Sequence, residues 1–134
     1  MADAVETYRS RDPVAKTETP FVPSEGLAAD VRRNIRRAVA NGSGDTHEMR
    51  FEWAPLPDGT FFDIRREDAT IVLNSRWRKQ LLAGRRSSKN DLPVIKSLLY
   101  LLLRDELARE RMREEGQRWL DICQQILISA ARVD

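Results

Sequence analysis

Three carboxylates, Asp58, Asp63 and Glu67, have the residue types and spacing that come nearest to metal chemistry in this chain. A metal-dependent nuclease holds Mg²⁺ between carboxylates and a lysine on adjacent strands. Here the pair Glu67-Asp68 is followed by no lysine within two residues, and the carboxylates are only a turn's width apart. Turn residues at hairpin ends therefore fit the pattern better, and a divergent metal-dependent nuclease is the last of three hypotheses.

Other catalytic groups are scarce. The chain has one histidine, His47, and one cysteine, Cys123, so neither a zinc site nor a catalytic triad can be assembled from the usual groups. Cys123 falls on the apolar face of an expected helix, where a buried thiol is inert. The six glycines form no phosphate-binding motif. The sequence therefore predicts a non-enzymatic protein with no cofactor and no metal.

Basic residues give a stronger signal. Between Arg65 and Lys89 there are eight basic residues and only two acidic ones. A surface built from this segment and from an expected N-terminal helix could contact nucleic-acid phosphates without reading sequence. The candidate contact residues are Arg32, Arg33, Arg36, Arg37, Arg76, Arg78, Lys79, Arg85 and Arg86. The patch exists only if the fold brings both groups to one side, and a solvated face balanced by acids is the alternative.

Length and charge set the broad class. The chain has 134 residues, about one domain, with 23 basic and 21 acidic residues and a net charge of +2. The chain has a single cysteine and no secretory signal, which predicts a cytoplasmic protein. Its longest apolar run, residues 98–103, is too short to cross a membrane.

The elements that must position these residues follow from periodicity. Residues 1–23, with three prolines and isolated apolar residues, predict a disordered or extended N-terminal arm. Residues 24–134 then form one domain. Ser24 is a suitable N-cap, and the apolar residues Leu27, Val31, Ile35 and Val39 recur every four positions, so a helix is expected over 24–40.

After a glycine-containing loop the period changes to two. Strands are expected around 49–53, 62–64 and 70–73, joined as a three-stranded antiparallel meander. A short helix follows over 76–82, and then a leucine-rich helix from Pro93 that should be the central core helix. Gly116 is expected to mark the turn into a last helix, giving a C-terminal helical hairpin.

The predicted fold class is therefore α+β. One face of the meander should pack on the leucine-rich helix and on the last helix. That face is made of Met49, Phe51, Trp53, Phe62, Ile64, Ile71 and Leu73. The inner face of the last helix is predicted to hold Trp119, Ile122, Cys123, Ile126, Leu127 and Ala130.

Two stretches carry a family resemblance. Residues 71–82 (IVLNSRWRKQLL) run from a strand ending in Leu-Asn into a helix with an aromatic and basic residues, and residues 91–103 (DLPVIKSLLYLLL) continue into a leucine-rich helix. Over about residues 60–130 the chain resembles the region after the ATPase module in bacterial GHKL-type ATPases, the Hsp90- and histidine-kinase-like proteins of restriction and phage-defence loci. The nucleotide-binding motifs of those ATPases have no counterpart here, so no ATP-site residue carries over.

The resemblance implies a stand-alone accessory protein, a partner subunit of a larger ATPase. Together with the missing catalytic groups, it makes a non-enzymatic interaction subunit of a larger, DNA-related or phage-defence complex the first hypothesis. A nucleic-acid-binding accessory protein that uses the arginine-rich residues is the second. A protein partner is expected in the first case and nucleic acid in the second.

Overall fold

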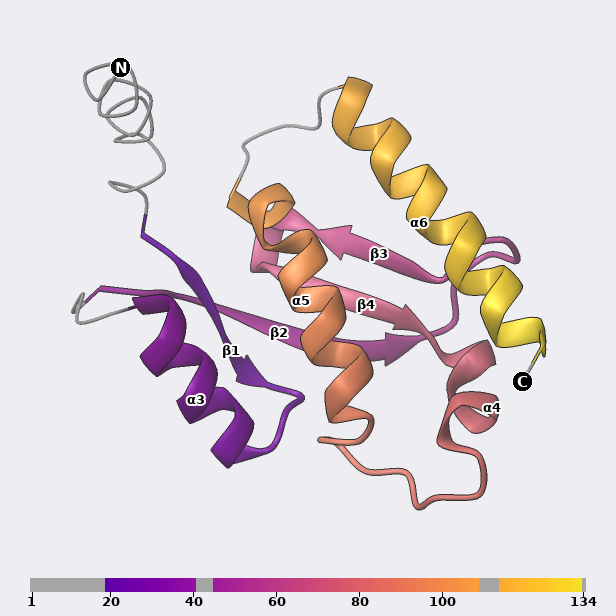
Figure 1. Ribbon diagram of the computed structural model, residues 1–134, viewed down its shortest axis with the longest axis horizontal. Coiled ribbons are helices and arrows are strands. Elements are labelled where there is room, and N and C mark those ends of the chain that lie inside the picture. Colours follow the sequence, from indigo (N-terminus) through magenta and orange to yellow (C-terminus); the bar gives the residue numbers. More distant parts are fainter. Residues whose placement is uncertain (1–18, 41–44, 109–113, 134) are drawn as a thin grey trace, which may run out of the picture.

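The computed structural model describes residues 19–40, 45–108 and 114–133. Most of the predicted arm, residues 1–18, lies outside the described residues. The described part is α+β, with a mixed four-stranded sheet of order β1-β2-β4-β3 and helices packed against it (Figure 1).

The chain begins its sheet earlier than expected. β1 (Phe21–Glu25) leads into α3 (Ala29–Ala40), and β2 (His47–Ala54) then pairs with β1 in parallel. The expected helix start at Ser24 is therefore wrong: Ser24 belongs to β1, and its Oγ donates to the Met49 carbonyl at 3.2 Å. The pairing of Phe21 with His47 joins residues far apart in the chain, so no local pattern could reveal it.

The three strands expected from alternation are present, but their pairing is not a meander. β3 (Phe62–Arg65) and β4 (Thr70–Asn74) are separated by a 3₁₀ turn, η1 (Arg66–Asp68). β4 lies between β2 and β3, parallel to β2 and antiparallel to β3. A parallel pair needs a connection of about a dozen residues or more, and residues 55–69, which include β3 itself, are long enough to supply it.

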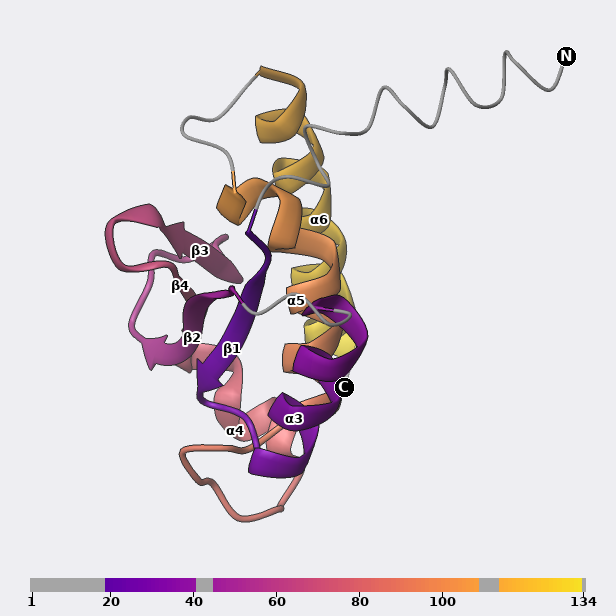
Figure 2. The same ribbon diagram turned by 90° about the vertical axis from the view of Figure 1, so that its left-hand side faces the viewer.

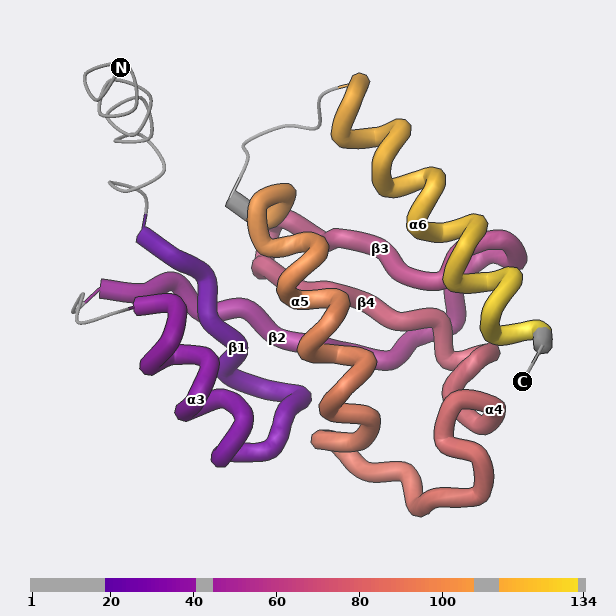
Figure 3. Tube along the Cα trace, in the orientation of Figure 1, coloured from indigo at the N-terminus to yellow at the C-terminus, as the bar shows by residue number. Residues whose placement is uncertain are grey.

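The helices cover one face of this sheet. After η2 (Ser75–Trp77) and α4 (Arg78–Leu82), the chain forms α5 (Pro93–Ala108) and α6 (Glu114–Val133). Figure 2 shows α3, α5 and α6 on the same side of the sheet, and no described helix on the other. Figure 3 shows that α5 and α6 run in opposite directions, with α4 beyond the end of β4.

The core lies between the sheet and this helical layer. The predicted apolar face is confirmed: Met49, Phe51, Phe62, Ile71 and Leu73 are buried, and Trp53 and Ile64 pack against the same cluster. From the helices, Leu99, Leu103, Leu120 and Cys123 complete it. The alternate side chains of each strand point to the uncovered face of the sheet.

α5 is not the enclosed core helix that its composition predicts. Leu99, Tyr100 and Leu103 are buried, but Leu98 and Leu101 are 56% and 60% exposed. The helix lies in an outer layer, so only one side of it can contact the sheet. Its other apolar side remains in contact with solvent.

The predicted inner face of α6 is also wrong for most of its residues. The structure buries Leu120, Cys123, Ile128 and Ala131, while Trp119, Ile122 and Ile126 are exposed. Gly116 is not the turn between the helices but lies within α6, where an added Cβ would come within 3.0 Å of Glu106 Oε1. Among the described residues, no helix is long and apolar enough to cross a membrane.

Candidate interaction surfaces

The outer side of α5 carries a continuous apolar stripe. Val94, Leu98, Leu101 and Leu102 follow one another at helical spacing, and their exposed fractions run from 43% to 71%. On α6, Trp119, Ile122 and Ile126 form a second stripe, each at least 47% exposed. Large apolar side chains scattered singly over a surface need no explanation, but two aligned stripes on neighbouring helices are a candidate interface.

The α5 stripe continues into a groove beside α3. Val31, Ile35 and Val39 line the α3 side, Tyr100 and Leu101 line the α5 side, and the groove has a volume of about 280 Å³. The predicted apolar face of the first helix is thus real from Val31 onward, but it is only half buried. The sequence placed Val31, Ile35 and Val39 on one face of the first helix, and it assigned the leucine-rich helix to the core. Apolar residues around most of the α5 circumference were interpreted as a sign of burial, whereas the structure leaves the outer side of that helix exposed.

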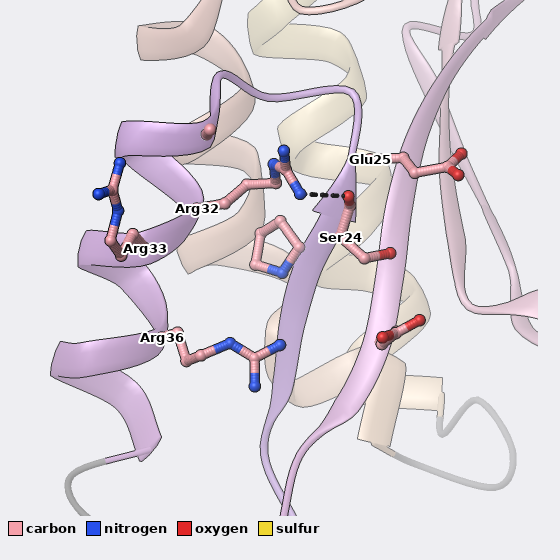
Figure 4. Close-up of a pocket in the computed structure, with 8 residues that line it drawn as sticks. Ser24, Glu25, Arg32, Arg33 and Arg36 are labelled. Carbon is pink, nitrogen blue, oxygen red and sulfur yellow. Dashed lines mark hydrogen bonds between the residues drawn. The ribbon is translucent and has the colours of Figure 1, made fainter.

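The arginines of α3 lie in a cleft of mixed charge. Arg32 and Arg36 extend from α3 toward β1, at a cleft of about 490 Å³ whose lining also includes Glu25 and Glu48. The Glu25 carboxylate points away from these arginines (Figure 4). Arg32 is held by the Ser24 and Leu27 carbonyls at 2.8 and 3.0 Å. Both partners are neutral carbonyls, so they hold the Arg32 guanidinium in place without cancelling its charge.

The other two α3 arginines are exposed at the helix surface. Arg33 pairs with Asp30, and Arg37 lies one turn further along the helix. All four predicted contact residues of α3 are therefore on the molecule's surface, at the β1 side of the sheet.

The second basic group surrounds α4. Figure 1 places α3 and α4 on opposite sides of the molecule, with α5 between them, so the two predicted groups do not form one continuous surface. Arg76 pairs with Asp58, and Arg78 pairs with the buried Asp91. In contrast, the side chains of Lys79 and Arg86 have no hydrogen bond or ion pair within the described part of the chain.

A buried ionic cluster lies where the parallel strands end. Asp91 Oδ2 accepts from Arg78 Nη2 at 2.8 Å and from the Ser88 amide at 3.1 Å, while Oδ1 accepts from Trp53 Nε1 and Lys96 Nζ at 3.0 and 3.2 Å. Lys96 Nζ also donates to the Gly26 and Lys89 carbonyls. Carboxyl ends of parallel strands are a common ligand site, but here both Asp91 oxygens and the Lys96 ammonium are engaged by other groups of the chain, so the pair is structural.

The ionisation of this cluster follows from its contacts. Burial acts to raise the pKa of Asp91, but the hydrogen bonds from Arg78, Ser88, Trp53 and Lys96 outweigh it and hold the pKa below its ordinary value. Burial lowers the pKa of Lys96, and the bond to Asp91 opposes that change. The carboxylate and ammonium therefore form a charged pair that joins the segment before α5 to β2 and to Gly26.

The uncovered face of the sheet is lined with ion pairs. Arg65 Nη2 lies 2.9 Å from both Glu52 Oε2 and Asp68 Oδ2, and Arg50 Nη2 lies 3.2 Å from Asp68. The bond to Arg65 is the main reason that the pKa of Asp68 is well below its ordinary value. Because Glu48 and Asp63 share this face, acids outnumber the two arginines. The excess of acidic side chains on the uncovered face of the sheet disfavours phosphate binding there.

The sheet edges are closed to an added strand. On β3, Gln124 of α6 binds the Phe61 and Phe62 amides and the Phe62 carbonyl. On β1, Tyr100 Oη donates to the Phe21 carbonyl at 2.6 Å, and Pro23 has no N–H to offer. Such protection is typical of edges that do not take part in strand pairing.

The carboxylates considered for metal chemistry are not brought together. Asp58 lies in the loop after β2 and pairs with Arg76, Asp63 is on β3, and Glu67 is in η1. Across residues 19–40, 45–108 and 114–133, no three acidic, histidine or cysteine side chains are grouped to hold a metal. His47 lies at the start of β2 against the Phe21 ring, and burial raises the pKa of the Cys123 thiol.

Comparison of the chain with protein-family models, with curated proteins and with solved structures gives no match. The proposed function therefore rests on the surfaces of the protein itself.

Proposed function

We propose that this protein is a non-enzymatic interaction subunit that binds an amphipathic helix of a partner protein across α5 and α6. The observation that carries the proposal is the pair of apolar stripes on these helices. Seven large apolar side chains there are between 43% and 71% exposed. They are Val94, Leu98, Leu101, Leu102, Trp119, Ile122 and Ile126.

Burial of these side chains by a partner would make a substantial contribution to the free energy of binding. Full burial of one such side chain contributes about 1.5–3 kcal/mol, so a half-exposed one still has about 1 kcal/mol to gain. Seven side chains together therefore offer roughly 7 kcal/mol before the entropic cost of association. Trp119 is the largest of them, and a tryptophan is a frequent energetic anchor in interfaces.

The arrangement of the stripes favours a helix as the occupant. Since Leu99 and Leu103 face the sheet, helical geometry turns Leu102 toward α6. By the same reasoning, Leu120 and Cys123 face the sheet, so Ile126 turns toward α5. A third helix laid along the space above them would place apolar residues at i, i+3, i+4 and i+7 on both stripes.

Two other binding modes are less compatible with the contacts. Strand addition requires a free sheet edge, and Gln124, Tyr100 and Pro23 close the edges. Binding through the uncovered sheet face would have to separate the ion pairs of Arg50 and Arg65. The groove beside Leu101 instead extends the apolar surface and can take one further side chain of a partner.

The family resemblance suggests the first partner to test. Residues 60–130 resemble the region that follows the ATPase module in GHKL-type ATPases, and a larger ATPase of that kind is our first candidate for the helix donor. The apolar stripes of α5 and α6 lie within the stretch of that resemblance.

The experiment is affinity purification from the native host, followed by reconstitution with the recovered partner as a purified protein. The test variant is L98E/I126E, which changes exposed positions and spares the core. The matched control is A29E/N90E, which adds two acids at exposed positions away from the stripes. We expect the wild type and the control to bind the partner, protection of α5 and α6 amides in the complex, and at least a tenfold weaker complex for the test variant.

Three outcomes would overturn the proposal. Equal binding by both double variants would place the interface elsewhere. A doubled mass of the purified wild-type protein in light scattering, abolished by L98E/I126E, would identify a second copy as the occupant. Recovery of proteins only through nucleic acid, with loss on nuclease treatment, would assign the association to a basic surface.

A further inference from the structure

A basic cleft lies beside α4, formed by the short helix and the loop that follows it. The cleft has a volume of about 540 Å³, and its polar lining comes from Ser75, Arg78, Lys79, Arg85 and Ser87. None of its lining residues is acidic. The cleft at α3 differs in that two acidic residues, Glu25 and Glu48, are among those that line it.

The charges around this cleft are only partly neutralised. From Ala69 to Asn90 the chain has six basic residues and no acidic one. Asp58 and Asp91 neutralise Arg76 and Arg78. The side chains of Lys79, Arg86 and Lys89 have no hydrogen bond or ion pair with any other described residue.

Arg85 differs from these three because its guanidinium is held in place. Its Nε donates to the Leu82 carbonyl at 2.9 Å and its Nη2 to the Leu81 carbonyl at 3.1 Å. Both partners are neutral carbonyls at the end of α4, so they orient the guanidinium without cancelling its charge. Lys79 also lines the cleft, and Arg86 and Lys89 lie in the loop that follows α4. This part of the surface therefore carries four cations without an acidic partner among the described residues.

We propose that this cleft binds the phosphate backbone of nucleic acid without reading its sequence. Oriented arginines, free lysines and serine hydroxyls are the groups that contact phosphate and sugar. This site is separate from the α5 and α6 stripes, so the inference does not depend on the proposed protein partner.

The number of free cations sets the expected strength and salt dependence. If each of the four contacts one phosphate, log K falls with log of salt concentration with a slope of about −3.6, roughly a 100-fold loss between 50 and 200 mM. Affinity should be in the micromolar range or weaker at physiological salt, as is typical of nonspecific binding.

The test uses fluorescence anisotropy with a labelled 20-base-pair DNA duplex of mixed sequence and the full-length protein. The variant K79E/R86E changes two side chains that have no hydrogen bond or ion pair with another described residue, and R33E/R37E makes the same change of charge on α3. Thermal melts check that both variants are folded. We expect K79E/R86E to weaken binding at least tenfold and to make the salt slope less steep by about two, with a smaller effect of R33E/R37E.

Three results would contradict a phosphate-binding site in this cleft. No binding at 50 mM salt would exclude the site. Equal losses in the two double variants would mean that net charge, and not this cleft, attracts the DNA. Displacement of the duplex by poly-glutamate at the same concentration of charges would make an acidic peptide the ligand instead and overturn the assignment.

Discussion

Asp91 and Lys96 form a buried ion pair in which Oδ1 and Nζ lie 3.2 Å apart and the two side chains are only 2% and 1% exposed. The pair connects three parts of the chain, because Trp53 of β2 and Arg78 of α4 also donate to Asp91, and Gly26 after β1 accepts from Lys96. A buried charge that keeps all its partners is tolerated, whereas one that loses its counter-ion is costly.

Replacing Asp91 by asparagine should therefore destabilise the protein by about 3–5 kcal/mol, because Lys96 and Arg78 would keep their charges without a counter-ion. Urea unfolding at pH 7 measures the loss. The control is D63N, at an exposed position on β3, which should change stability by less than about 0.5 kcal/mol. A D91N variant as stable as D63N would show that the cluster relaxes or admits water.

The stability that D91N loses relative to the wild type depends on pH. The pKa of Asp91 is lower in the folded protein than in the unfolded chain, so the unfolded chain takes up the proton first as the pH falls. The contribution of Asp91 is complete above about pH 4, the ordinary range of a carboxyl group, and is lost as the pH falls below it. D91N should consequently lose less stability than the wild type between pH 5 and pH 3.

Gly26 supports the turn from β1 into α3, and its replacement by alanine should be more harmful than the same change at Gly84. Both residues have positive φ, +89° and +85°, but an added Cβ at Gly26 would lie 2.8 Å from the Phe51 Cβ and carbonyl oxygen, whereas Gly84 has open space around it. We expect G84A to cost about 1 kcal/mol from backbone strain and G26A at least about 3 kcal/mol from strain and overlap. Thermal unfolding of both variants checks the difference, and equal costs would refute the close approach at Phe51.

Local sequence patterns predicted the strands of this fold better than its topology. Alternation around Met49, Phe51 and Trp53 located β2 because burial on one face requires period two. The order of strands depends on partners distant in the chain, such as Phe51 with Ile71, and no local pattern records that pairing. β1 is short, contains Pro23 and has little periodicity, so it was assigned to the arm and to the start of a helix.

The helices show a second limit of sequence patterns. α5 and α6 have apolar residues on both the inner and the outer side, so the pattern could not say which arc faces the sheet. For α6 the prediction included Ile126, which is 62% exposed, and omitted Leu120, which is buried. The same ambiguity hid the candidate interface, because residues such as Leu98 and Trp119 were attributed to the core. In contrast, the two groups of basic residues are evident in the sequence itself. Only the fold shows that the group on α3 and the group around α4 lie on opposite sides of the molecule.

Gln124 closes the edge of the sheet at the start of β3, and its removal should open that edge. Oε1 accepts from the Phe61 and Phe62 amides at 2.7 and 3.1 Å, and Nε2 donates to the Phe62 carbonyl at 2.6 Å. These bonds also attach α6 to the sheet. In Q124A the two amides lose this side-chain acceptor, so we expect both to exchange with solvent at least tenfold faster, as measured by hydrogen–deuterium exchange with NMR detection.

A second substitution at this position separates the acceptor from the donor. Glutamate in Q124E keeps an oxygen for the Phe61 and Phe62 amides but cannot donate to the Phe62 carbonyl. Its two amides should therefore stay closer to wild-type protection than those of Q124A, while the Ile71 amide in the interior strand β4 serves as a reference that neither change affects. Equal exchange in Q124A and in the wild type would show that β3 is protected by its pairing with β4 alone. Faster exchange at Ile71 as well would indicate that loss of the Gln124 contacts loosens the whole sheet rather than its edge.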